Sequence, residues 1–134
     1  MSENHYLQLF PVPKVLECSD GRFHLPAQGS IVLAGEADRA ALPAARRLQL
    51  TLSQVLQLNL SLSVGTRPSV RPVYHFSYSP LRPAQGYEIH VDENGIAVNY
   101  SSPEGAYYAA ATLKQILQQC GRNLPFVHIS DQPD

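Results

Sequence analysis

Residues 87–120, YEIHVDENGIAVNYSSPEGAYYAAATLKQILQQC, decide the fold class. The first part holds two runs, YEIHVD and IAVNYS, in which apolar and polar side chains alternate as in a half-buried strand. Glu93-Asn94-Gly95 joins them, and Asn-Gly between alternating runs is a strong short-range signal for a β-hairpin. The predicted hairpin pairs its apolar positions, which are Tyr87, Ile89, Val91, Ile96, Val98 and Tyr100.

A helix is predicted directly after this hairpin. The spacing from Ser101 to Glu104 is that of a capping box, and Pro103 suits the first turn of a helix. The helical pattern runs to about Gln119, and Gly121 is a suitable residue for the C-terminal cap.

The rest of the chain predicts shorter elements around this unit. They are a β-hairpin at 15–25 that turns at Ser19-Asp20-Gly21, a buried strand at 30–34, an amphipathic helix at 40–57 with Pro43 in its first turn, and strands at 58–64, 73–79 and 127–129. Helices and strands are mixed without regular alternation. The sequence therefore predicts an α+β fold, with one mixed, mainly antiparallel sheet and two helices on one face.

Composition limits the classes of function. The chain has 134 residues, enough for one ordinary domain, with 44% hydrophobic residues and a net charge of −1. Neither sign of charge forms a long block, which argues against nucleic-acid and membrane-surface partners, and no apolar stretch reaches the ~20 residues of a membrane-spanning helix. No signal peptide is visible, so a cytoplasmic location is the default, and a secreted one applies if a signal was removed.

Three segments carry a resemblance to a known family. GYEIHV, the GAYYAAATLKQIL helix and the HISDQPD ending, in this order and spacing, resemble the small N-terminal domain that precedes the catalytic barrel in glycoside hydrolase family 20, the β-N-acetylhexosaminidases. The opening LFPVPKVLECSDGRFHLP is similar to the first strands of that domain. The resemblance implies a single accessory domain over 1–134, before a catalytic (β/α)8 barrel that these residues do not include. Related small domains also precede other exo-acting glycosidase barrels.

The resemblance places the chemistry of the family outside this sequence. Family members use an Asp-Glu pair on the barrel and the acetamido group of the substrate, and no position here matches that motif, so we expect no catalytic residue and no cofactor. The sequence also contains no GxSxG, GxGxxG or Walker-type motif.

Metal-ligating residues show no motif either. The five histidines have no metal-ligand spacing, which predicts no metal site and leaves open one assembled from separate strands. His90 and His128 alternate with apolar neighbours and are expected on the wetter face of the sheet. Cys18 and Cys120 are far apart and lack a partner motif, so they are predicted to be buried free thiols.

The second face of the predicted helix after the hairpin is unusual. One broad stripe of Ala, Leu and Ile would face the sheet, whereas the remaining circumference carries Lys114 as its only charge. A face in bulk water usually carries several Lys or Glu, so we infer that another body covers it, and the resemblance names the barrel; the alternative is a solvated, Gln-rich face. The expected barrel-facing residues are Tyr107, Tyr108, Ala111, Thr112, Gln115 and Asp131.

Three functions follow from these patterns. The first is a non-catalytic accessory domain that supports the barrel of a glycoside hydrolase, with that barrel as its partner. The second is a free-standing carbohydrate-binding module that uses exposed tyrosines. The third, an independent small hydrolase, has least support because no nucleophile, base and orienting residue can be named together. Self-association of the isolated chain through its apolar helix face is left open.

Overall fold

The structure is a computed structural model that describes residues 7–65, 72–80 and 86–132. Its strands are β1 (Val15–His24), β2 (Ser30–Leu33), β3 (Ser61–Val64), β4 (Pro72–Tyr78), β5 (Tyr87–Asp92), β6 (Gly95–Tyr100) and β7 (Asn123–Asp131). Its helices are the short 3-10 helix η1 (Glu36–Ala41) and the α-helices α1 (Leu42–Leu56) and α2 (Pro103–Cys120).

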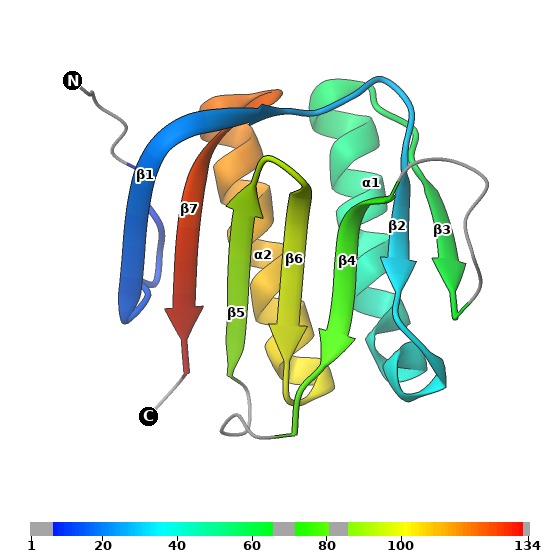
Figure 1. Ribbon diagram of the computed structural model, residues 1–134. Helices are drawn as coiled ribbons and strands as arrows, with labels where there is room; N and C mark the ends of the chain where they lie inside the picture. Colours follow the sequence, from blue (N-terminus) through cyan, green and yellow to red (C-terminus); the bar gives the residue numbers. More distant parts are fainter. Residues whose placement is uncertain (1–6, 66–71, 81–85, 133–134) are drawn as a thin grey trace.

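The molecule has two layers (Figure 1). The described residues form one seven-stranded sheet in the order β1-β7-β5-β6-β4-β2-β3. Both α-helices cover the same face of this sheet, and the other face is open (Figure 1). The predicted α+β fold with two helices on one face is therefore confirmed.

The sheet divides into an antiparallel part and a parallel part. The pairs β1–β7, β7–β5 and β5–β6 are antiparallel, whereas β6–β4, β4–β2 and β2–β3 are parallel. The chain passes from β2 through α1 to β3, and such a crossover is what parallel neighbours require. The antiparallel part contains both the predicted hairpin and the two chain segments farthest apart in sequence.

The hairpin that decides the fold class forms as predicted. Ile89 lies opposite Val98, and Asp92 lies opposite Gly95, so Glu93 and Asn94 make the turn. The Asn94 N–H donates to Asp92 Oδ1 at 2.8 Å, and Gly95 has a φ of 128°, which side chains rarely allow.

The predicted hairpin at 15–25 is wrong. Residues Val15–His24 form one strand, β1, that pairs along its length with β7. Asp20 and Gly21 sit at a bulge, because the register shifts between Ser19 and Arg22. Gly21 has a φ of 121°, and a Cβ there would lie 2.3 Å from a Phe126 ring carbon. Asp20 and Gly21, which favour a turn in the sequence, thus form a bulge within a single strand.

The ends of the other elements differ from the predictions by a few residues. Helix α2 is capped by Ser102 rather than Ser101, since Ser102 Oγ accepts the Gly105 N–H at 3.2 Å. Gly121 follows α2 as its C-cap and Pro43 lies in the first turn of α1, both as predicted. Strand β3 starts at Ser61 rather than at 58, and β7 extends beyond 127–129 at both ends.

The core lies between the sheet and the helices. Its largest fully buried side chains are Tyr74, Tyr100, Phe76, Leu25, Ile31, Leu33, Leu48, Leu52, Ile89, Leu113, Ile116 and Leu117. The prediction of two buried thiols is wrong, because Cys18 is exposed on the edge strand β1 and Cys120 is only partly buried at the end of α2. Among the described helices, none has the length and apolar character to cross a membrane.

Candidate functional site

The outer face of α2 is the candidate site because it is only partly covered within the domain. The sheet-facing side of the helix is buried, including Ala106, Ala109 and Leu113. On the other side, Tyr107 and Tyr108 are 43% and 44% exposed, and Ala111 is also exposed. The helix therefore has two faces, as its sequence predicts.

A groove of about 450 Å³ brings most of the predicted interface together. Its lining includes Phe10, Tyr108, Ala111, Thr112, Gln115 and Asp131. Five of the six predicted interface residues thus share one groove, between the N-terminal segment, α2 and the end of β7.

Tyr107, the sixth predicted residue, lies toward α1 instead. It lines a second, shallower groove of about 370 Å³ with Pro43 and Ala44. The guanidinium carbon of Arg47 lies 5.3 Å from the centre of its ring, a cation–π distance. The Tyr107 and Tyr108 side chains therefore line neighbouring grooves on the helical side of the molecule.

The N-terminal segment, residues 7–14, crosses the outer face of α2 and is bound there by two glutamines. The Phe10 N–H donates to Gln115 Oε1 at 2.8 Å, and Gln115 Nε2 donates back to the Phe10 carbonyl at 2.9 Å. Gln119 makes the same pair of bonds with Gln8, at 2.8 and 2.7 Å. Residues four apart lie on one helix face, so the two amides together hold an extended segment.

These hydrogen bonds explain why glutamines rather than charged residues occupy part of the outer face of α2. A glutamine can satisfy both backbone groups of one residue in an extended chain, whereas Lys or Glu can satisfy only one kind. The N-terminal segment of the chain itself therefore hydrogen-bonds to Gln115 and Gln119, which sequence reasoning missed. Two glutamines with i, i+4 spacing on a helix with few charged residues were the available signal.

Two of the predicted interface residues are also engaged within the domain. Thr112 is only 7% exposed, and its hydroxyl lies 2.7 Å from the Tyr87 hydroxyl of β5. Burial is the largest cause that raises the pKa of Tyr87. Asp131 Oδ1 accepts the Lys14 N–H at 3.2 Å. Thr112 and Asp131 thus position the walls of the groove.

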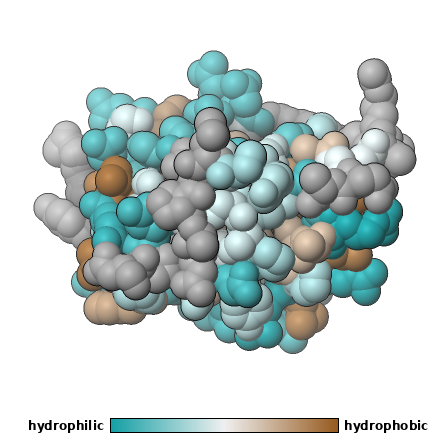
Figure 2. Space-filling model, turned by 90° about the horizontal axis from the view of Figure 1, so that it is seen from below, coloured by the Kyte–Doolittle hydropathy of each residue, from teal (hydrophilic) through white to brown (hydrophobic). Residues whose placement is uncertain are grey.

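Large apolar side chains nevertheless remain exposed around the groove. Phe10 is 70% and Val12 is 72% exposed, and both line the groove beside Tyr108. Leu50 of α1 is exposed as well. Seen from below, the described surface shows hydrophobic residues in separate patches among hydrophilic ones (Figure 2). Exposed apolar side chains gathered around a hollow are typical of a contact surface.

One group of potential metal ligands converges elsewhere among the described residues. Glu88, His90 and His128 lie on the open face of the sheet, with one ligand atom from each within 4.8 Å of the others. They come from two strands, so no spacing in the sequence reveals them. The open-face position expected for both histidines agrees with the structure.

The fold defines a small domain in which two α-helices cover one face of a mixed sheet. Residues 6–132 match the family model described as glycosyl hydrolase family 20, domain 2. The chain therefore belongs to this family, as a copy of its domain 2.

The similar proteins are much longer than this chain. A β-hexosaminidase of Porphyromonas gingivalis is 27% identical over 138 residues, which span 95% of this chain and 17% of that protein. An exo β-N-acetylglucosaminidase of family 20 from Vibrio harveyi, in complex with N-acetylglucosamine, is 25% identical with a TM-score of 0.78, over 99% of this chain and 20% of that one. The Flavobacterium johnsoniae chitobiase, at 23% identity and a TM-score of 0.76, shares the fold over 93% of this chain and 20% of its own.

Proposed function

We propose that this domain is a non-catalytic accessory domain of a longer β-N-acetylhexosaminidase and that it stabilises the catalytic domain beside it. One observation carries the proposal: the whole chain matches a fifth or less of proteins named as β-hexosaminidase or exo β-N-acetylglucosaminidase. The catalytic groups of such a protein then lie in its remaining part, which agrees with the absence of a catalytic motif in this sequence.

The outer face of α2 is the surface that we propose for the contact with the catalytic domain. Phe10, Val12 and Tyr108 surround the groove and leave apolar area in water. Burial of such area contributes roughly 25 cal/mol per Å² to association before the entropic cost of ordering. The proposed partner surface covers the groove and the ring of Tyr107 together.

The first test compares activities. The 134-residue chain and the longer protein that contains it are assayed with a chromogenic N-acetylhexosaminide. Turnover is expected from the longer protein and not from the chain alone. Robust hydrolysis by the chain alone would overturn the accessory role, and an inactive longer protein would overturn the activity class.

The second test probes the contact itself. Tyr108→Asp in the longer protein places a charge at the groove, and we expect a lower midpoint of thermal unfolding for the catalytic domain. His75→Asp, at an exposed position of β4 on the open face of the sheet, is the control and should leave that midpoint unchanged. Equal midpoints for the two variants would contradict the proposal that the outer face of α2 contacts the catalytic domain.

A carbohydrate-binding module is the second candidate. It is supported by the position of the Tyr108 ring beside the polar groups of Gln115 and Asp131 in one groove. Calorimetric titration with N-acetylglucosamine oligomers separates the two roles. A saturable heat that disappears in Tyr108→Asp would favour carbohydrate binding, whereas no heat agrees with the accessory role.

A further inference from the structure

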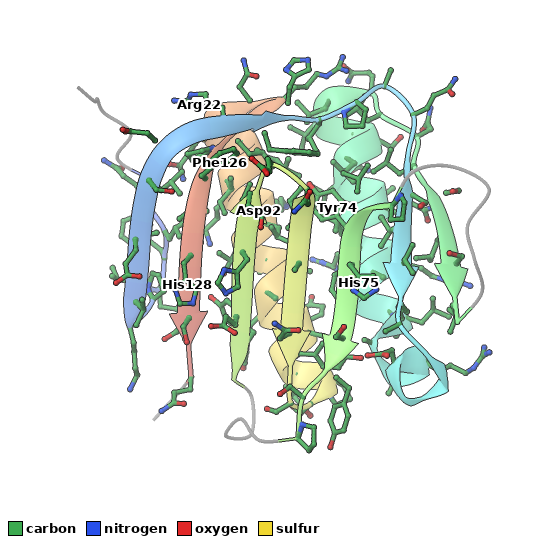
Figure 3. All side chains as sticks on the ribbon, viewed as in Figure 1. Arg22, Tyr74, His75, Asp92, Phe126 and His128 are labelled. Carbon is green, nitrogen blue, oxygen red and sulfur yellow. The ribbon has the colours of Figure 1, made fainter. Side chains whose placement is uncertain are left out.

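The open face of the sheet carries a cluster of two histidines and two carboxylates. His90 of β5 lies directly opposite His128 of β7, and Glu88 lies two residues before His90 on the same face. Glu17 of β1 lies opposite His128 on its other side. Figure 3 labels His128 on the face of the sheet that is turned away from the helices.

One ligand atom from each of the three side chains lies within 4.8 Å of the other two. Glu88 Oε2 lies 2.7 Å from His128 Nε2 and 3.5 Å from His90 Nε2. The two imidazole rings are stacked, with centroids 4.2 Å apart and planes only 9° from parallel. Ligand atoms around a tetrahedral Zn²⁺ with bonds of about 2.0–2.1 Å are roughly 3.4 Å apart, which is near the spacing of the Glu88 oxygen from the two ring nitrogens. An imidazole binds a cation in its ring plane, so the two rings must turn out of their stacked arrangement when the cation binds.

A second carboxylate completes the pattern of a metal-binding histidine. Glu17 Oε1 lies 3.5 Å from His128 Nδ1, the ring nitrogen that does not face Glu88. A ligating histidine usually donates its other N–H to a carboxylate, which fixes the tautomer and makes the free nitrogen a better ligand. Glu17, whose side chain is 74% exposed, is the carboxylate beside this second nitrogen of His128.

The three side chains differ in exposure. The Glu88 side chain is 15% exposed, that of His128 is 31% exposed and that of His90 is 45% exposed. A carboxylate that is partly withdrawn from water holds its charge more favourably when a cation neutralises it. A hollow of about 290 Å³ lined by Glu17, His90 and His128 lies beside the cluster and leaves room for further ligands of a cation.

We propose that Glu88, His90 and His128 bind a divalent transition-metal cation, with Zn²⁺ favoured by two imidazole nitrogens and one carboxylate oxygen. The cation ties β5 to β7 in the middle of the antiparallel part of the sheet. This site is on the opposite face from the groove, so it does not depend on the proposed accessory role.

The test is equilibrium titration of the metal-free 134-residue chain with Zn²⁺ near neutral pH, followed by Co²⁺ substitution. We expect one equivalent to bind, with a visible Co²⁺ spectrum typical of nitrogen and oxygen ligands. His128→Ala and Glu88→Gln should lose this binding, and Glu17→Gln should weaken it by about 10–100-fold.

His75→Ala is the matched control, because His75 is an exposed histidine of β4 on the same face of the sheet. It should bind Zn²⁺ as the unchanged chain does, and circular dichroism checks that each variant is folded. Unchanged binding in folded His128→Ala would overturn the proposal. Equal loss in His75→Ala, or no binding to the unchanged chain, would overturn it as well.

Discussion

Strand β5 presents two different surfaces to the two sides of the sheet. Toward the helices it places Tyr87, Ile89 and Val91, each no more than 4% exposed. Toward the open side it places Glu88, His90 and Asp92, which are partly or fully exposed. The backbone is shared, and only the alternation of side chains separates an apolar core from a cluster of ionisable groups.

This difference indicates that the helical side of the sheet stabilises the fold and the open side carries the ionisable groups. Apolar burial on the helical side supplies most of the free energy of folding, since exposed charged pairs contribute at most about 1 kcal/mol each. The open side is thus available for chemistry at small cost to stability. The outer face of α2 is intermediate, because the N-terminal segment covers only part of it.

The largest expected effect is loss of core packing on the helical side of β5. Ile89→Ala removes a completely buried side chain, and we expect the free energy of unfolding to fall by about 2–5 kcal/mol. Urea denaturation measures this loss, and the dependence of the unfolding free energy on urea concentration should stay unchanged. His90→Ala, the neighbouring position on the open side, should cost about 1 kcal/mol or less. Similar losses for the two variants would contradict the division between the faces.

A smaller effect is expected where the backbone of the hairpin approaches β4. A Cβ at Gly95 would lie 2.8 Å from the carbonyl oxygen of Val73, and φ there is 128°. Gly95→Ala should therefore lower the free energy of unfolding by about 1–3 kcal/mol in thermal denaturation. Gly35→Ala, where a Cβ meets no atom within 4 Å, is the control. If Gly35→Ala cost as much as Gly95→Ala, the close approach would not be the cause.

The next effect separates the predicted cap of α2 from the observed one. Ser102→Ala removes the oxygen that accepts the Gly105 N–H, and such caps contribute roughly 1 kcal/mol. Ser101→Ala should cost less in the same denaturation experiment, since the described cap bond is made by the following residue. A larger cost at Ser101 would favour the capping box that the sequence predicts.

Local patterns predicted the parts of the fold whose partners are near in sequence. The β5–β6 hairpin follows from alternation around Asn94 and Gly95, and both helices follow from periodicity and end signals. Asp20 and Gly21 led to the wrong prediction of a hairpin, because the same residues suit a turn and a bulge. Pairing with β7, about a hundred residues away, determines that they form a bulge. The parallel pairs of β4 likewise depend on contacts that no local pattern encodes.

The candidate sites were predictable to different degrees. From the missing charges on α2 we expected a face covered by another body, which stays a prediction, and five of the six expected residues line one groove. The segment that binds Gln115 and Gln119 comes from the other end of the chain, so its contribution was not visible in the helix alone. His90 and His128 meet only through the register of β5 and β7.

The smallest effect is expected at the rim of the groove. Phe10 is 70% exposed, and its backbone groups rather than its ring bind Gln115. Phe10→Ala in the 134-residue chain should thus change the free energy of unfolding by no more than about 0.5 kcal/mol, measured by urea denaturation. Leu9→Ala, at the adjacent buried position, is the contrasting variant and should cost about 2 kcal/mol or more. A loss at Phe10 as large as that at Leu9 would mean that the ring packs within the domain, and the groove would then offer less apolar surface to a partner.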